Sequence, residues 1–379
     1  MFSFPTPLEN SKLVNQVTFL VYRRGALFST HLCDLLPAAK RITRLPGEGW
    51  HSQSLTLGKR RKISRRIQAT VVAFRLLPLR MKTIASLLVL FAAVAYAADA
   101  PTPQAAAKDA PFVNSLGMKF VPIEITGGPT NGKRVLFSIW ATRFKDFLRF
   151  AKAAHFHTTP GMEAIGVGGV PTWHIDSNAS WEHPGFPQTD DHPVVGVTWY
   201  DAKAFCMWLT NTERASGKIK KGDKYRLPTD HEWSCAVGLG LQEKAEEPAQ
   251  TKDGRIEGVY PWGKQWPPPR GAGNFADETA KTAKSCSEFI DGYSDGYAYT
   301  SPVGKFAENP FGLYDMGGNV GQWCDDFGDA GRLNRVLRGG SWCLSDAVEL
   351  LSSSRLIIAE ENRNIGFGFR CVLVVGEDK

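Results

Sequence analysis

The chain has 379 residues, of which 43% are hydrophobic and 11 are tryptophan, a composition that excludes a disordered chain and allows one large domain or two ordinary ones. Its net charge of +7 is unevenly placed, because residues 1–80 carry 14 Lys and Arg against 3 Asp and Glu. The rest of the chain carries 31 Lys and Arg against 35 Asp and Glu, so a nucleic-acid partner, which needs a basic excess on the folded part, is not expected.

Residues 81–97 have the layout of a secretory signal peptide. Lys82 supplies the positive start, Ile84–Val94 the apolar core and Ala95–Ala97 a small-x-small cleavage site. The apolar run is shorter than the roughly 20 residues of a membrane span. Because such a signal normally stands at the N-terminus, we interpret residues 1–80 as an over-extended start or a disordered basic segment; a cytoplasmic tail before a signal anchor is the alternative. The sequence therefore predicts an exported protein, periplasmic or extracellular, without membrane contact beyond the signal segment.

Composition then divides the mature part into a linker and one domain. Residues 98–111 are rich in Ala and Pro and are typical of a linker. Residues 112–376 show no internal repeat, short apolar runs and frequent Gly and Pro, which predicts one continuous domain of short strands and long loops.

Two segments have helical periodicity, Thr142–Ala154 and Trp199–Arg214. The apolar face expected of the first consists of Phe144, Phe147, Leu148 and Ala151, and that of the second of Ala202, Phe205, Cys206 and Leu209. Pro228 and Thr229 are expected to open a further helix, with an ion pair between Arg226 and Glu232.

The predicted mature chain keeps six cysteines: Cys206, Cys235, Cys286, Cys324, Cys343 and Cys371. An even number in an exported chain suggests disulfides, and six cysteines allow 15 connectivities, among which spacing alone does not choose.

Six short motifs follow one another along the domain. They are His192–Trp199 (HPVVGVTW), Tyr225–Trp233 (YRLPTDHEW), Tyr260–Gly263 (YPWG), Phe311–Met316 (FGLYDM), Gly318–Trp323 (GNVGQW) and Arg338–Trp342 (RGGSW). In this order they resemble the formylglycine-generating enzyme family, also called the sulfatase-modifying-factor family. The resemblance extends from about Val113 to Cys371 and implies an α+β, C-type-lectin-like fold of the sulfatase-modifying-factor type with little regular secondary structure. The tryptophans of these motifs are expected in the core.

The resemblance also implies structural calcium, held by oxygen atoms of the kind this ion prefers. The expected ligands of a first ion are Asn274 and Asp295 by side chain, with Phe275 and Tyr297 by carbonyl. Those of a second ion are Asp315 and Gln322 by side chain, with Gly318 and Val320 by carbonyl. Gln322 stands where the family usually has glutamate, and Asp315 where the oxidase has asparagine. The alternative is that Asp295 and Asp315 cap turns.

The copper centre of the family's oxidase is where this chain departs from the pattern. The family holds Cu(I) with two cysteines, at whose positions this chain has Leu344 and Glu349. Because soft thiolates suit Cu(I), copper is not expected here. Ser341 matches the serine of the family's pocket, and Cys343 lies one residue before the first copper position. If the segment is extended, the Cys343 side chain should point away from the Leu344 side.

Two functions remain open on these residues. The first is a non-oxidase binding or accessory module, whose pocket receives a protein or peptide segment or a small ligand. The second is a formylglycine-generating-like oxidoreductase with altered chemistry, for which Ser341 and Cys343 are the candidate catalytic residues, together with Glu349. The resemblance further implies a disulfide between Cys206 and Cys371, which family members similar in both segments form.

Overall fold

A computed structural model describes residues 101–166, 172–286 and 288–376. The predicted signal peptide at 81–97 and the basic segment at 1–80 lie outside the described residues. In the described ranges, no helix combines the length and the apolar character that a membrane span needs.

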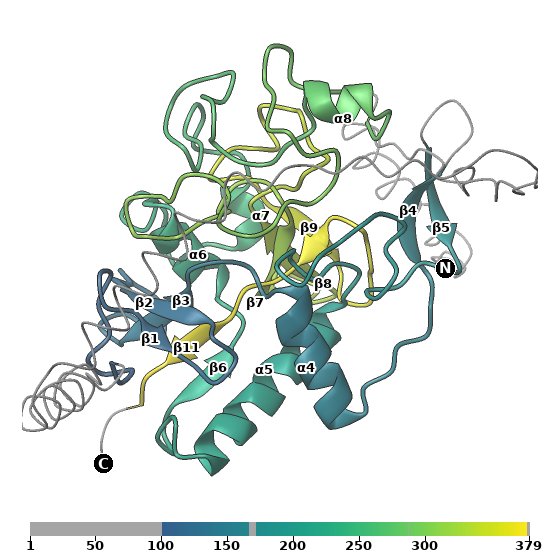
Figure 1. The fold of residues 1–379 in the computed structure, drawn as a ribbon. Helices are drawn as coiled ribbons and strands as arrows, with labels where there is room; N and C mark the ends of the chain where they lie inside the picture. Colours follow the sequence, from purple (N-terminus) through teal and green to yellow (C-terminus); the bar gives the residue numbers. More distant parts are fainter. Residues whose placement is uncertain (1–100, 167–171, 287, 377–379) are drawn as a thin grey trace, which may run out of the picture. The chain divides into compact units, whose positions relative to one another are not determined.

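One antiparallel sheet joins the two ends of the domain. In spatial order its strands are β1 (Phe112–Val113), β2 (Lys119–Ile123), β3 (Val135–Ser138), β11 (Val372–Val374) and β6 (Lys224–Arg226). The C-terminal strand β11 lies between β3 and β6, with Val372 opposite Phe137 on one side and Arg226 on the other. The pairing therefore holds both ends of the domain in one sheet (Figure 1).

A second sheet lies near the middle of the molecule as drawn in Figure 1. Its strands, in order, are β10 (Phe367–Gly368), β7 (Gly321–Phe327), β8 (Asn334–Arg338) and β9 (Leu356–Ala359). Strands β10 and β7 run parallel, whereas the other pairs are antiparallel. A separate hairpin pairs β4 (Met162–Gly166) with β5 (Thr172–Asp176).

The described helices are α4 (Phe144–Ala154), α5 (Trp199–Ala215), α6 (Asp230–Ala236), α7 (Ala249–Lys252) and α8 (Glu278–Thr282). The periodicity predicted α4 and α5 within two residues of their observed bounds. The whole expected face of α5 is buried, and Thr198 caps its N-terminus by accepting the Asp201 N–H. The helix expected after Pro228 is α6, where Thr229 is the N-cap.

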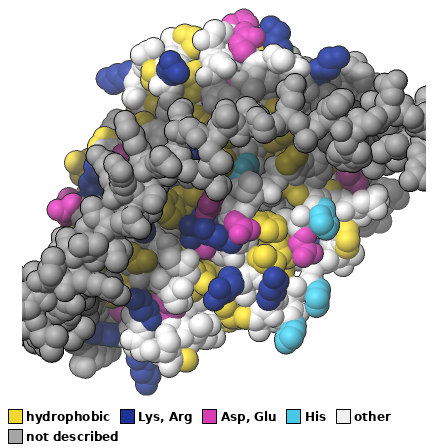
Figure 2. Space-filling model, viewed as in Figure 1, with side chains coloured by type: hydrophobic (Ala, Val, Ile, Leu, Met, Phe, Trp, Pro, Cys, Tyr) yellow, Lys and Arg dark blue, Asp and Glu magenta, His cyan; other side chains and the backbone are white. Residues whose placement is uncertain are grey.

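The expected ion pair next to α6 is also present, since the Arg226 guanidinium contacts both carboxylate oxygens of Glu232 at 2.6 Å. Large aromatic side chains fill the core: Trp233 and Trp323 are fully buried, and Trp342 is nearly so. On the face drawn in Figure 2, Lys and Arg side chains are interspersed with Asp and Glu, so this face carries charges of both signs.

Residues 101–111, where the composition indicated a linker, pack against the domain. Ala106 is only 4% exposed and belongs to the main apolar cluster. The Arg134 guanidinium donates to the carbonyls of Pro103 and Ala106, and Lys108 contacts Glu308. Burial of Ala106 and these polar contacts fix the described part of the segment, so it is not a free tether. The described residues thus form the predicted α+β fold, with little regular secondary structure.

Candidate functional site

Ser341 and Cys343 lie side by side after the end of β8. The two preceding glycines have left-handed backbone angles, with φ of +94° at Gly339 and +66° at Gly340, which favour glycine. A side chain at Gly339 would also stand 2.9 Å from the Met316 carbonyl oxygen. After them the chain forms a turn instead of an extended strand, so the expected alternation of side chains does not apply. The Ser341 Oγ lies 2.9 Å from the Cys343 Sγ.

The Cys343 thiol is buried and protonated. It is 4% exposed, and burial raises its pKa to about 12 against the opposing hydrogen bond from Ser341. The negative charge of Glu349 raises the pKa further. Since the thiolate is the nucleophile and the metal ligand, Cys343 is inert in this state.

The four residues predicted for the first calcium ion come together in loops next to α8. The fully buried Asn274 donates through Nδ2 to the Tyr299 carbonyl at 2.8 Å, and its Oδ1 receives no hydrogen bond. Asp295 accepts only two backbone N–H groups, from Phe275 at 2.9 Å and Tyr297 at 2.8 Å. Among the described residues, nothing donates to the carbonyl oxygens of Phe275 and Tyr297. These unpaired oxygens fit the donor set of a calcium ion.

The negative charge of the carboxylates at this site also favours a bound cation. Burial, reinforced by the negative charge of Asp277, raises the pKa of Asp295 to about 7. Asp277 is fully buried and was not anticipated as part of the site; its carboxylate accepts the N–H of Ala280, as the N-cap of α8, and that of Asp295. An N-cap aspartate before a short helix was the signal that could have located it. Among the described residues, the buried Asp277 and the half-buried Asp295 have no cationic partner, and two such carboxylates favour a bound cation.

The second predicted set consists of Asp315, Gly318, Val320 and Gln322. One member fits: Asp315 is 5% exposed, and its Oδ1 has no hydrogen-bond partner. Gln322 does not, because its Oε1 already accepts Trp233 Nε1 at 3.1 Å and Arg370 Nε at 2.6 Å. A guanidinium on the oxygen that should bind the ion opposes a second positive charge. We therefore propose no ion at this position.

Cys206 of α5 faces Cys371, the residue before β11. Their Sγ atoms are 3.5 Å apart, both thiols are buried, and no bond joins them. A disulfide, with sulfur atoms about 2.05 Å apart, needs only a small approach of the two side chains. The disulfide between Cys206 and Cys371 therefore stays a prediction.

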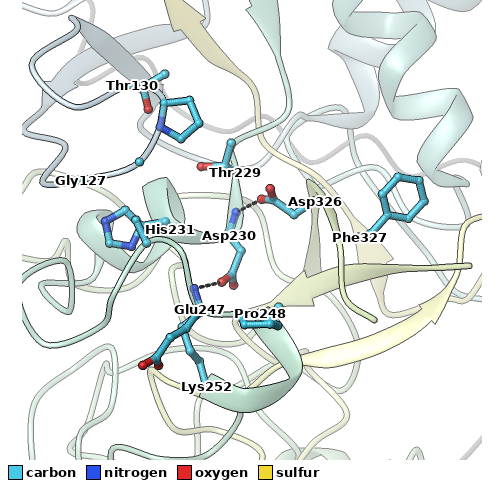
Figure 3. A pocket seen from close by; sticks show the side chains of 14 residues that line it. Gly127, Thr130, Thr229, Asp230, His231, Glu247, Pro248, Lys252, Asp326 and Phe327 are labelled. Carbon is cyan, nitrogen blue, oxygen red and sulfur yellow. Dashed lines mark hydrogen bonds and ion pairs between the residues drawn. The ribbon is translucent and has the colours of Figure 1, made fainter. Parts of the chain in front are cut away.

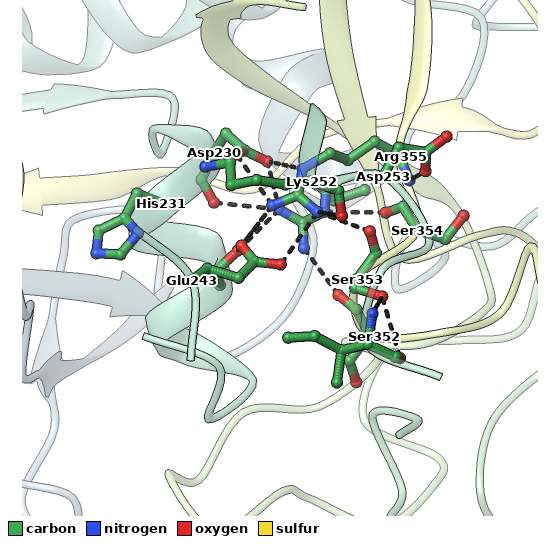
Figure 4. Close-up of polar contacts among 12 residues, drawn as sticks. Asp230, His231, Glu243, Lys252, Asp253, Ser352, Ser353, Ser354 and Arg355 are labelled. Atoms are coloured by element: carbon green, nitrogen blue, oxygen red, sulfur yellow. Dashed lines mark hydrogen bonds and ion pairs between the residues drawn. The ribbon is translucent and has the colours of Figure 1, made fainter. Parts of the chain in front are cut away.

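A buried ionic cluster that the sequence did not indicate lies at the start of α6 (Figure 4). Its members are Asp230, Glu243, Lys252, Arg338 and Arg355, each at most 8% exposed. They come from two separate segments, residues 230–252 and 338–355, so no local sequence pattern predicts the cluster.

Next to this cluster is a cavity of about 190 Å³ (Figure 3). Its walls are the loop 127–130, the start of α6, residues 245–252 and the end of β7 at Asp326 and Phe327. Burial raises the pKa of Asp326 to about 6. A second cavity of about 340 Å³ lies beside Trp140 and Arg143. Neither cavity includes Ser341 or Cys343. Within the described ranges, no three His, Cys, Asp or Glu side chains are placed to hold a metal together.

Comparison with known proteins gives a consistent result. The family model described as the sulfatase-modifying factor enzyme 1-like domain, FGE-sulfatase, matches residues 137–375. The formylglycine-generating enzyme of Thermomonospora curvata is 35% identical over 184 residues, which are 46% of this chain and 49% of that protein. That of Streptomyces coelicolor is 27% identical over 306 residues, 73% of this chain and 82% of that protein. The chain thus spans about half the length of the first relative and most of the second.

A third relative carries a different name. The mouse (Mus musculus) protein named inactive C-alpha-formylglycine-generating enzyme 2 is 29% identical over 253 residues, 63% of this chain and 67% of that protein. Among solved structures, PvdO from Pseudomonas aeruginosa has 20% identity and a TM-score of 0.42, covering 69% of this chain and 96% of PvdO. CarF has 20% identity and a TM-score of 0.43, covering 69% of this chain and all of CarF.

Proposed function

Because the chain belongs to the family of the sulfatase-modifying factor enzyme 1-like domain, we propose that it is an exported binding or accessory module that does not make formylglycine. In this proposal the family pocket receives a protein or peptide segment, or a small ligand. The observation that carries it is that Leu344 and Glu349, which match the two copper cysteines, offer no thiol, while the thiol of Cys343, one residue earlier, is buried and hydrogen bonded to Ser341.

The chemistry at the copper positions supports this reading. Leu344 offers no lone pair, and Glu349 offers hard oxygen atoms that match Cu(I) poorly. The Cys343 thiol is hydrogen bonded to Ser341, and burial raises its pKa to about 12, so it is neither a ready ligand nor a ready nucleophile at neutral pH. The same facts count against the alternative, an oxidoreductase that uses these residues. The relatives include proteins named for the activity and proteins named inactive, so membership by itself leaves both outcomes open.

Copper-loaded protein is expected to leave a Cys-x-Pro-x-Arg peptide unchanged under air. The test is mass spectrometry for conversion of the thiol to an aldehyde. The matched variant combines Leu344→Cys and Glu349→Cys, which restores both thiol positions and should gain Cu(I) binding. Turnover by the natural chain that survives Cys343→Ala would place the active centre elsewhere, whereas turnover lost on Cys343→Ala would establish a single-thiol oxidase; either result ends the binding-module proposal.

We also propose that calcium binds the first site. When bound, the ion would be held by Asn274 Oδ1, the Asp295 carboxylate and the carbonyls of Phe275 and Tyr297. Its role is structural, because it would neutralise the buried Asp277 and the half-buried Asp295 and join the loop at 274–277 to the loop at 295–297. Loops that bury little apolar surface gain most from such a tether.

Removal of calcium with a chelator is expected to lower the melting temperature. A ligand that binds only the folded state stabilises it by about 2.7 kcal/mol at a concentration 100 times its Kd. Asp295→Asn should abolish the response to calcium, and Asp291→Asn, at a neighbouring exposed carboxylate, should preserve it. Differential scanning calorimetry of the three proteins measures this. Identical melting curves with calcium and with chelator would show that calcium does not bind the folded protein at this site.

The same site gives the ion-free protein a defined pH dependence. Because burial raises the pKa of Asp295 to about 7, the folded state binds this proton more tightly than the unfolded state does. Without calcium, the contribution of Asp295 to stability therefore falls as the pH rises from about 4 to 7, and this slope should vanish in Asp295→Asn.

A further inference from the structure

Helix α6 places a histidine and a cysteine one turn apart on the same face. His231 and Cys235 are related by i and i+4, the spacing at which side chains of a helix meet. Both are buried, at 6% and 5% exposure.

The ring of His231 is held in one orientation and one tautomer. Its Nε2 is hydrogen bonded to the carbonyl oxygen of Thr126, and since a carbonyl can only accept, this nitrogen carries the proton. Nδ1 is left with a lone pair and receives no hydrogen bond. The hydroxyl of Thr126 lies 3.7 Å from the Cys235 Sγ. A thiol, a base beside it and a third group that orients the base are the parts of an activated nucleophile.

The glycine at position 240 leaves space for the Cys235 thiol that a larger residue would fill. A side chain at Gly240 would stand 2.6 Å from the Cys235 Sγ and 2.7 Å from the Thr126 Oγ1. The absence of a side chain at Gly240 therefore permits the thiol to lie between this loop and Thr126.

The charges of the pair reinforce each other. Burial raises the pKa of the Cys235 thiol, but the interaction with His231 and the hydrogen bonds from Thr126 outweigh it, so the net pKa is lowered. The same thiol raises the pKa of His231 against burial and the positive charge of Lys252. Both directions favour a thiolate facing an imidazolium.

Four of the other described cysteines differ. Burial raises the pKa of Cys206, Cys286, Cys324 and Cys343. They serve as internal controls for any reaction of Cys235.

The cavity of Figure 3 reaches this pair on the side of His231, since Cys235 itself is not among the residues that line it. His231 lines it, and so do Gly127–Thr130, which directly follow Thr126. The volume of about 190 Å³ equals that of about six liquid water molecules, so the reactant must be small.

We propose that Cys235, with His231 as its acid–base partner, is a nucleophilic thiol site that reacts with small disulfides entering from this cavity. The thiolate sulfur attacks one sulfur of R–S–S–R, the S–S bond of the reagent breaks, and a mixed disulfide forms at Cys235. Cys235 is oxidised, the departing R–S⁻ sulfur is reduced, and it takes the proton from the imidazolium. No further oxidant is required.

The test uses 2-hydroxyethyl disulfide and iodoacetamide on the full chain at neutral pH, with peptide mass spectrometry to place the adducts. Cys235 is expected to react first and to retain its reactivity to a lower pH than the other cysteines do, because the net pKa of its thiol is lowered. His231→Gln keeps a donor for Thr126 but removes the base. It should slow the reaction at pH 7 by about tenfold for each unit by which the pKa of the Cys235 thiol rises. His183→Gln, at an exposed histidine, should leave the rate unchanged.

A second measurement needs no histidine variant. On titration, the ultraviolet absorbance of a thiolate should appear at a lower pH in the natural chain than in Cys235→Ser. The proposal is overturned if Cys235 reacts no faster than the buried Cys324, if the rate and pH profile of His231→Gln equal those of the natural chain, or if the two absorbance titrations coincide.

Discussion

Replacement of Asp230 by asparagine is expected to lower the free energy of unfolding by about 3–5 kcal/mol, the effect of breaking a buried ion pair from one side. Asp230 is 3% exposed and contacts three cations: Arg338, Arg355 Nε at 2.9 Å and Lys252 Nζ at 2.8 Å (Figure 4). Glu243 is the other carboxylate of the cluster and contacts Arg355 at 2.5 Å. Without Asp230, three buried cations would share one carboxylate.

The pKa of Asp230 shows how strongly the three cations stabilise its charged form. Burial by itself raises its pKa, but the charges of Arg338, Arg355 and Lys252 outweigh burial and hold the pKa well below its usual range. A depressed pKa contributes stability that is present above the unfolded value of about 3.9 and is lost as the pH falls toward the folded value. Part of the natural chain's acid sensitivity should therefore be missing in Asp230→Asn.

Urea unfolding at neutral pH measures the difference, and the neighbouring Asp326 supplies a matched control. Asp326 accepts the Asp230 N–H but forms no ion pair among the described residues, and burial raises its pKa to about 6. Its raised pKa makes the charged form unfavourable above pH 6, so Asp326→Asn is expected to be neutral or stabilising at neutral pH. Equal losses in the two variants would contradict the account, because burial of a carboxylate would then matter and its cations would not.

Oxidation of Cys206 and Cys371 to a disulfide is expected to raise the free energy of unfolding by about 4–5 kcal/mol, the chain-entropy value for a loop of this size. The two residues are 165 positions apart in the chain, and their Sγ atoms are 3.5 Å apart in the fold. The bond would connect α5 to the residue that precedes β11, and so would restrict the unfolded chain over most of the domain.

Peptide mapping without reductant identifies the bond, and urea unfolding with and without reductant measures its effect. Cys206→Ser should remove the response to reductant, and Cys324→Ser, at another buried cysteine, should keep it. The prediction fails if the exported protein contains both residues as free thiols, or if reductant destabilises Cys206→Ser as much as the natural chain.

The local sequence determined where the helices lie and where they begin, because these features depend on residues that are close together in the chain. The spacing of apolar residues located α4 and α5, since a helix buries every third or fourth side chain whatever lies against it. Thr229 marked the start of α6 because an N-cap acts within three residues. The motif order identified the family, and the resemblance predicts Leu344 and Glu349 at the positions of the oxidase's copper cysteines.

Only the tertiary structure decided the chemical state of the residues. Asp230 meets Arg338 and Arg355 across more than 100 positions, and His231 meets Thr126 across 105. Nothing in the local sequence distinguishes the thiols of Cys235 and Cys343. In the fold, the contact with His231 lowers the pKa of Cys235, whereas burial raises the pKa of Cys343. Desolvation and Coulomb interactions depend on distances in space and on the loss of water, and a linear sequence specifies neither until the chain is folded.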